Sequence, residues 1–294
     1  MKYILEYYLF RTVAILVRLL PLRVVRWFGV AIGYISFYVI RLRRSVTIEN
    51  LRLSFPQHSS GRITQIARES YVNLAITILE MLWIPRLSDD ILSRELHIEN
   101  PELVREKLQA NQGVLVLSGH IGNWELMAYG VGKLLGFSYL IVVHSQNNPR
   151  VRDQINAIRT CGGNRVVDMR TAGRAMLRAL GNNEWVALLA DQSAPRESIY
   201  VDFFGRPAST FEGPAVMALK TRVPLLMCYC IRQEDYRYRV WFEELAYDDL
   251  VEFNRENVRA LTERHVKALE RVIARHPGQW LWQHRRWKHR PSEH

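Results

Sequence analysis

After Gly113 the sequence pattern changes, and short apolar runs alternate with segments of helical periodicity. The first run, residues 114–117, ends in a glycine-bearing turn, and an amphipathic segment follows it. Parallel strands need a long crossover between them, usually a helix, so this alternation favours a parallel sheet covered by helices. We therefore predict an α/β fold with a mostly parallel central sheet flanked by helices.

The pattern predicts an order of elements along this part of the chain. The expected strands are residues 114–117, 139–143, 165–168, 185–190 and 224–231, with a further strand at 236–245 that is antiparallel at an edge. The expected helices are residues 60–85, 125–135, 150–161, 172–180, 212–222 and 254–275.

The N-terminal part of the chain is apolar but carries several arginines. The run over residues 3–20 is interrupted by charged residues, and the run over 27–40 is followed by a basic cluster over 41–44. Neither run reaches the roughly 20 apolar residues of a comfortable membrane span. A short span, a helical pair lying in the membrane interface, or a pair of core helices all fit. We predict a membrane-anchoring helical segment over residues 1–55 and an α/β catalytic domain over 56–294.

Composition indicates an anionic partner and a reducing compartment. The net charge is +11, and six of the forty basic residues are lysine, so arginine dominates. Arginine binds phosphate and carboxylate groups bidentately, which suits nucleic acid, anionic lipid or an acidic carrier protein. Cys161, Cys228 and Cys230 lack metal or redox spacing, and we expect buried thiols. Cysteines without a disulfide framework fit a reducing compartment.

Two polar clusters follow predicted strands. In the first, His120 precedes Glu125 by five positions, with the histidine expected in the turn and the glutamate in the first helical turn. Such a pair is either a general base with an orienting carboxylate or a structural polar contact. In the second, Asp191 and Gln192 follow residues 185–190. Ligands bind where parallel strands end, so the clusters are expected to converge, unless Asp191 only caps a turn.

Several motifs in fixed order carry a family resemblance. They are residues 50–56 (NLRLSFP), 120–125 (HIGNWE), 148–149 (NP), 190–192 (ADQ), 201–207 (VDFFGRP), Pro224 and 279–291. On these the chain resembles, over nearly its whole length, the bacterial lipid A biosynthesis acyltransferases, which add secondary acyl chains. More broadly it is similar to the lysophospholipid acyltransferases, whose signature is His-x4-Asp/Glu.

The resemblance implies transfer of an acyl chain from a carrier thioester to a lipid hydroxyl. It implies a site on the cytoplasmic side of the bacterial inner membrane and no metal or dissociable cofactor. Acyl carrier protein is the expected donor, with acyl-CoA as the alternative. The expected acceptor is a glycolipid, a lipid A precursor, although a lysophospholipid or another membrane lipid would use the same core. Anionic membrane lipids are expected partners and nucleic acid is not.

Residue roles follow from this chemistry. We expect His120 to act as general base, Glu125 to hold its other ring nitrogen, and backbone N–H groups near Gly119 and Gly122 to stabilise the oxyanion. No covalent acyl-enzyme is expected. The remaining predicted substrate-binding residues are Asn123, Arg159, Asp191, Gln192, Arg196 and Arg206, the three arginines being candidates for phosphate groups.

Two readings from other classes stay open on the residues alone. A basic, tryptophan-rich, membrane-proximal protein can bind partners without catalysis, but that role leaves the His120 turn unexplained. One histidine and two carboxylates, His120, Glu125 and Asp191, can also ligate a transition metal in a hydrolase.

Overall fold

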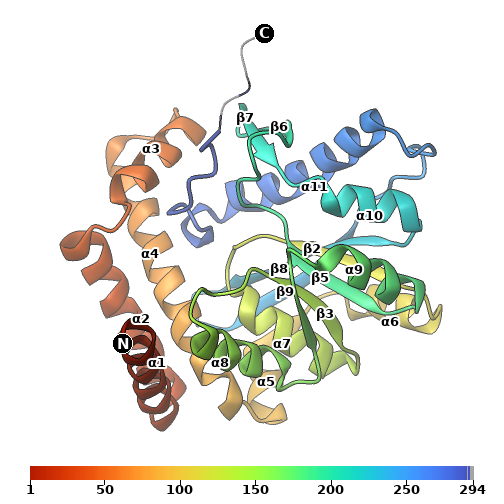
Figure 1. The fold of residues 1–294 in the computed structure, drawn as a ribbon. Coiled ribbons are helices and arrows are strands. Elements are labelled where there is room, and N and C mark those ends of the chain that lie inside the picture. The colour runs from red at the N-terminus through yellow and green to blue at the C-terminus, as the bar shows by residue number, and fades with distance from the viewer. Residues whose placement is uncertain (290, 292–294) are drawn as a thin grey trace.

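The computed structural model describes residues 1–289 and 291, and in them a seven-stranded sheet forms the centre of the fold (Figure 1). The strands, in spatial order, are β1 (Leu96–Ile98), β9 (Tyr238–Glu244), β8 (Leu225–Arg232), β2 (Val114–Ser118), β5 (Trp185–Leu189), β3 (Tyr139–Val143) and β4 (Arg165–Asp168). Every neighbouring pair is parallel except β8 with β9. The predicted mostly parallel sheet is confirmed.

The ends of this order differ from the prediction. The strand expected at 236–245 is antiparallel, as predicted, but β1 pairs with it and takes the edge position. The three residues of β1 are too few to show an alternating pattern. The hairpin formed by β6 (Ile199–Phe203) and β7 (Arg206–Thr210) was also not predicted as strands. Its turn residues Phe204 and Gly205 both have positive φ, as tight hairpin turns require.

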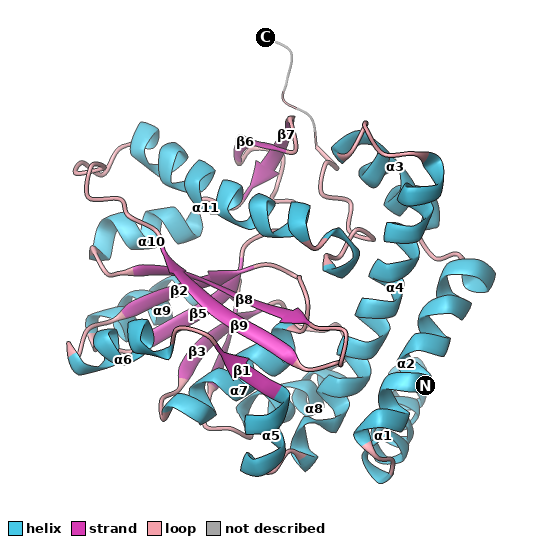
Figure 2. Ribbon diagram, turned by 180° about the vertical axis from the view of Figure 1, so that it is seen from behind, coloured by secondary structure: helices cyan, strands magenta, loops and turns pink. Residues whose placement is uncertain are grey.

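Helices cover both faces of the sheet (Figure 2). One face packs on α9 (Ala172–Gly181), α10 (Gly213–Thr221) and α11 (Arg255–Arg275). The other packs on α5 (Asp89–Glu95), α6 (Pro101–Gln109), α7 (Trp124–Leu135) and α8 (Pro149–Thr160). Within β2, Leu115 and Leu117 point to the first core, while Val114 and Val116 point to the second. This alternation explains why buried parallel strands read as continuous apolar runs.

The N-terminal helices lie to one side of the sheet and are joined to it by α4 (Ser60–Trp83) (Figures 1 and 2). They are α1 (Lys2–Leu19), α2 (Leu22–Ile35), a π-helical turn (Ser36–Ile40) and α3 (Arg44–Ser54). Gly29 and Gly33 let α2 approach α4 closely, since a Cβ at Gly33 would lie 2.5 Å from the Val72 Cα. Residues Leu22–Ile40 form one stretch long and apolar enough to cross a membrane, by length and composition.

Candidate active site

A histidine and an aspartate meet where two neighbouring parallel strands end. His120 follows β2, and Asp191 follows β5, which pairs with β2. The His120 Nδ1 lies 2.7 Å from the Asp191 Oδ1, and the His120 backbone N–H donates to the Asp191 Oδ2 over 2.7 Å. The predicted convergence of the two clusters is confirmed, and Asp191 does more than cap a turn.

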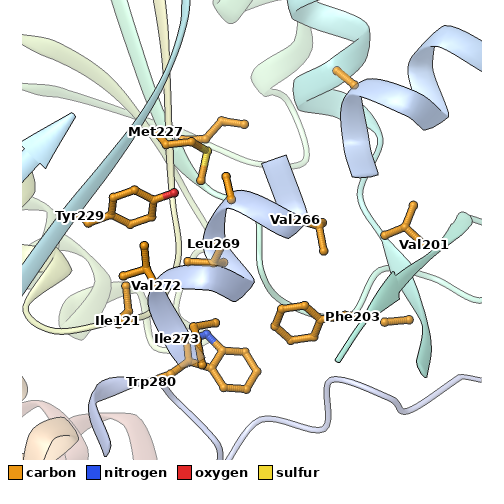
Figure 3. Packing of buried hydrophobic residues seen from close by; sticks show 14 of the residues in the cluster. Ile121, Val201, Phe203, Met227, Tyr229, Val266, Leu269, Val272, Ile273 and Trp280 are labelled. Carbon is orange, nitrogen blue, oxygen red and sulfur yellow. The ribbon is translucent and has the colours of Figure 1, made fainter. Parts of the chain in front are cut away.

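Asp191 is a buried carboxylate held in its ionised form. Its Oδ2 also accepts a hydrogen bond from the Trp280 indole N–H, over 2.8 Å. Burial alone would raise the pKa of Asp191, but the His120 charge and the hydrogen bonds from His120 and Trp280 outweigh it and lower the pKa to about 2. Trp280 in turn packs in the core beside Ile273 of α11 (Figure 3). The carboxylate that faces His120 is therefore anchored to the core.

This arrangement sets the tautomer of His120. An ionised carboxylate only accepts hydrogen bonds, so the proton of neutral His120 resides on Nδ1, and Nε2 keeps a free electron pair. The His120 side chain is 20% exposed and lines a cavity. The Gln192 amide nitrogen lies 3.4 Å from His120 Nε2, and the Trp124 ring packs against the imidazole. A basic nitrogen thus faces the cavity.

Glu125 lies in the first turn of α7, as predicted, but it binds a different partner. Its carboxylate accepts two hydrogen bonds from Arg159 at the end of α8, from Nε over 2.9 Å and from Nη2 over 2.5 Å. The predicted contact of the Glu125 carboxylate with the His120 ring is wrong, because Asp191 occupies that position. The α7 start instead directs Glu125 toward α8. Such a bidentate pair fixes the guanidinium plane of Arg159 in the wall of the cavity.

The cavity has a volume of about 500 Å³ and lies between the sheet and α7. Polar side chains of His120, Gln192, Ser193, His144 and Gln146 contribute to it. Its apolar walls include Val116, Ile141, Ala187 and Cys228 from the strands, Met127 and Ala128 from α7, and Met169 and Phe211 from loops. An apolar pocket with a few convergent polar groups is the usual form of a ligand site.

Three predicted substrate-binding residues build the turn that follows β2, residues 119–123, and do not line this cavity. Gly122 has φ +59°, and a Cβ there would lie 1.7 Å from the Cys230 carbonyl oxygen, so glycine is required. Its N–H donates to the Gln279 carbonyl over 3.0 Å, which makes the predicted oxyanion role wrong for this amide. Asn123 is fully buried and caps α7, and Gly119 leaves room for Asp191 and Leu269.

Of the predicted phosphate-binding arginines, Arg159 lines the cavity, while Arg196 and Arg206 are absent from its lining. Arg196 is exposed in the loop before β6. The Arg206 guanidinium stacks on the Trp287 ring, 4.4 Å from its centroid. A role of these two arginines in binding phosphate stays a prediction.

The cysteines and possible metal ligands are also placed. Cys228 and Cys230 are buried on one face of β8, as predicted, whereas Cys161 at the end of α8 is exposed, contrary to the prediction. Within the described residues, no group of three or more His, Cys, Asp or Glu side chains is arranged to hold a metal ion.

A family model described as bacterial lipid A biosynthesis acyltransferase matches residues 1–289. The chain belongs to this family. It is an acyltransferase, and the resemblance carried by the sequence motifs is confirmed.

Individual relatives agree with this family. The acyltransferase is 25% identical over 278 residues to the lipid A biosynthesis palmitoleoyltransferase of Escherichia coli K12, covering 92% of this chain and 87% of that protein. It is 23% identical over 277 residues to the lipid A biosynthesis lauroyltransferase of the same organism, covering 93% and 88%. The phosphatidylinositol mannoside acyltransferase of Mycobacterium tuberculosis CDC 1551 is 25% identical over 211 residues, covering 68% and 63%.

Some residues around the site of this acyltransferase escaped the sequence analysis. Trp280 lies in the motif over residues 279–291, but no role at the site was predicted for it, and its indole contact with Asp191 spans 89 positions of the chain. His284 accepts a hydrogen bond from the Ser193 backbone N–H over 2.9 Å, across a similar separation. A sequence signal does exist for a third group, since Asn73, Thr77 and Glu80 are polar residues spaced i, i+4 and i+7 within an apolar helix.

Proposed function

We propose that this enzyme transfers a fatty acyl chain from a carrier thioester to a hydroxyl group of a lipid A precursor, with His120 as general base and Asp191 as its orienting carboxylate. The observation that carries the proposal is the 2.7 Å contact between His120 Nδ1 and a buried, ionised Asp191, which leaves Nε2 basic at an apolar cavity. A histidine so oriented is matched to removing a proton from a hydroxyl group near neutral pH.

The chemical step uses one histidine for two proton transfers. His120 Nε2 takes the proton of the acceptor hydroxyl as its oxygen attacks the thioester carbonyl carbon, and Asp191 stabilises the imidazolium that forms. The tetrahedral intermediate then collapses, the carbon–sulfur bond breaks, and the imidazolium proton goes to the leaving thiolate. An ester and a free thiol result, and no acyl group is attached to the enzyme.

The apolar walls of the cavity support binding of the donor's acyl chain in it. Its apolar walls extend from His120 along the sheet to Val116 and Cys228, and α7 closes the other side. Burial of methylene groups against these walls contributes about 0.8 kcal/mol per group. A chain bound there brings its thioester carbonyl toward the polar side chains beside His120.

In this scheme Glu125 acts through Arg159. The ion pair is neutral overall, and both partners line a cavity wall that is otherwise largely apolar. The guanidinium N–H groups that Glu125 does not occupy are held in a fixed plane, and such donors are suited to stabilising the oxyanion of the tetrahedral intermediate, or a phosphate of the substrate. This role replaces the orienting role expected for Glu125 from the sequence.

Exposed apolar side chains on the N-terminal helices support membrane association. Leu5, Leu16, Trp27 and Val39 are examples, with between 56% and 73% of their surface exposed. Helix α2 is packed tightly on α4, and its Arg26 is buried in ion pairs. We therefore infer that α1 and α2 lie in the membrane–water interface rather than cross the bilayer. The proposed location is the cytoplasmic side of the bacterial inner membrane.

The names of the relatives support the choice of acceptor. Two of them act in lipid A biosynthesis, and the mycobacterial relative is named for an inositol mannoside, which makes another glycolipid the alternative acceptor. The net charge of +11 suits an acidic acyl carrier protein as donor.

The test is an in vitro transfer assay with the purified full-length enzyme in detergent. Acyl carrier protein and CoA thioesters are compared as donors to a lipid A precursor, and the product is identified by mass spectrometry. We expect transfer with wild type, faster from the carrier protein at low salt than at high salt, and none with His120→Ala. Isolation of an acyl-enzyme on the reaction path, or full activity of His120→Ala, would contradict the mechanism.

A further inference from the structure

Helix α4 presents three polar side chains, here called the polar stripe, to the turn that follows β2 (residues 119–123). The side chains of Asn73 and Thr77 both donate to the Gly122 carbonyl oxygen, over 3.0 and 2.9 Å. One helical turn further along, Glu80 faces Asn123. All three residues of the stripe are at most 4% exposed. Neither Asn73, Thr77 nor Glu80 lines the cavity, so the stripe contacts the turn from behind.

Glu80 is the only ionisable member of this stripe, and its carboxylate faces α2, β8, β9 and the turn before α7. Toward β8, its Oε2 lies 3.9 Å from Arg232 Nη2. Its Oε2 accepts from the Asn123 amide over 2.7 Å and from the Tyr238 hydroxyl of β9. Its Oε1 accepts from Arg26 Nε of α2 over 2.6 Å. A buried carboxylate is costly unless its oxygens are paired, and here both oxygens have partners.

The contact with Asn123 acts on the start of α7. The Asn123 Oδ1 accepts from the Leu126 backbone N–H over 2.9 Å and so caps the helix. Its backbone N–H donates to the Cys230 carbonyl over 3.1 Å. Since the amide group donates to Glu80 through nitrogen, the oxygen is turned toward the helix and the side chain has one orientation. Asn123 in turn lies three residues after His120.

We propose that Glu80 is a positioning residue for catalysis: by fixing the orientation of Asn123 it sets the start of α7 and with it the placement of His120 and Trp124. The proposal rests on the proposed role of His120 as general base. It predicts an effect on turnover, because an error of about 1 Å in the placement of a reacting group lowers the rate by about a hundredfold.

The chain offers a matched control for the loss of charge. Glu95, the last residue of α5, also accepts a hydrogen bond from Arg26, from Nη2 over 2.6 Å, but Asn123 donates to Glu80 and not to Glu95. Glu80→Gln and Glu95→Gln each remove one carboxylate charge from the surroundings of Arg26. Both are expected to lower thermal stability, while Glu80→Gln alone disturbs the orientation of Asn123.

The experiment measures kcat, donor KM and thermal unfolding of full-length variants in the transfer assay described above. We expect Glu80→Gln to lower kcat by about tenfold or more, with donor KM within about twofold of wild type, and Glu95→Gln to keep kcat within about twofold. Asn123→Ser keeps a capping oxygen but loses the contact with Glu80, so its kcat should fall as in Glu80→Gln. The double variant Glu80→Gln/Asn123→Ser should be no slower than the slower of these two single variants, because both substitutions remove the same contact.

Two outcomes overturn the proposal. In the first, Glu80→Gln and Glu95→Gln lose turnover in the same proportion, which assigns Glu80 to stability alone. In the second, Glu80→Gln fails to fold and Asn123→Ser has the kcat of wild type.

His120→Ala is measured in parallel. If it is inactive while Glu80→Gln behaves like Glu95→Gln, the positioning role fails and the general base stands; if it is active, the proposed function itself fails.

Discussion

The chemistry of His120 depends on which carboxylate contacts its ring. The His-x4-Glu spacing predicts Glu125, but the carboxylate that contacts His120 belongs to Asp191, which follows the neighbouring strand β5. Asp191 contacts both the ring and the backbone of His120, whereas Glu125 has both oxygens on Arg159. The two carboxylates therefore have separable roles, and substitutions can separate them.

We expect Asp191→Asn to reduce kcat by about a thousandfold with little change in donor KM. An amide can donate a hydrogen bond to Nδ1, which favours the tautomer with its proton on Nε2 and removes the basic nitrogen. Steady-state kinetics checks this, with thermal unfolding to show that the variant is folded. An Asp191→Asn enzyme with wild-type kcat would remove Asp191 from the mechanism.

A double-mutant cycle tests the role of Glu125. If Glu125 acts through Arg159, then Glu125→Gln and Arg159→Met each lower activity, and the double variant is no worse than the more damaging single one. The cycle is measured as kcat/KM. Losses that simply add, with an interaction below about 0.5 kcal/mol, contradict the coupling.

The site lies where strands end and helices begin, after β2, after β5 and at the start of α7. The range 139–143 matches β3, because a buried strand of an α/β sheet is apolar along its whole length. The range 165–168 matches β4, an edge strand whose two central valines are only partly buried and are flanked by Arg165 and Asp168. The contacts around the turn could not be predicted in the same way. Trp280, Glu80 and Arg159 reach it from distant parts of the chain, and spacing rules describe only neighbours along one element.

The exposed apolar face of α1 and α2 predicts lipid binding. We expect Leu16→Glu combined with Trp27→Glu to weaken binding to vesicles containing anionic lipid, because each substitution places a charge on the inserted face. Leu177→Glu, at an exposed leucine of α9 on the other side of the molecule, is the control and should bind as wild type does. Vesicle sedimentation measures this, and equal binding of all three proteins contradicts the assignment.

At the scale of the whole molecule, the sequence was sufficient for the fold class and the family and insufficient for the assignment of side-chain partners. Order and type of motifs indicated an acyltransferase, and the family match confirms it. The partner of His120 depends on how β2 and β5 pair, which is a property of the assembled sheet. The burial of polar groups that limit stability at low pH is likewise a property of the assembled fold.

Stability is expected to fall as the pH drops below about 6.5, and His265 of α11 is one cause. Burial, together with the charge of Arg286, lowers the pKa of His265 to about 3, from 6.5. Between these values the unfolded chain binds a proton that the folded protein does not, so stability rises with pH in this range. At pH 5 the cost is about 2 kcal/mol.

The pH dependence of thermal unfolding checks this for wild type and His265→Gln. The variant should lose less of its thermal midpoint than wild type between pH 7 and pH 5, since glutamine takes up no proton. Parallel curves for the two proteins would show that His265 does not contribute.

Acyl transfer that depends on the His120–Asp191 pair can be tested by mass spectrometry of membrane lipids from cells that express wild type, His120→Ala or Asp191→Asn at equal levels. We expect wild type to add one fatty acyl mass to one class of glycolipid, and we expect the same mass to be absent with His120→Ala and strongly reduced with Asp191→Asn. An acylated product that persists undiminished with His120→Ala would contradict this expectation.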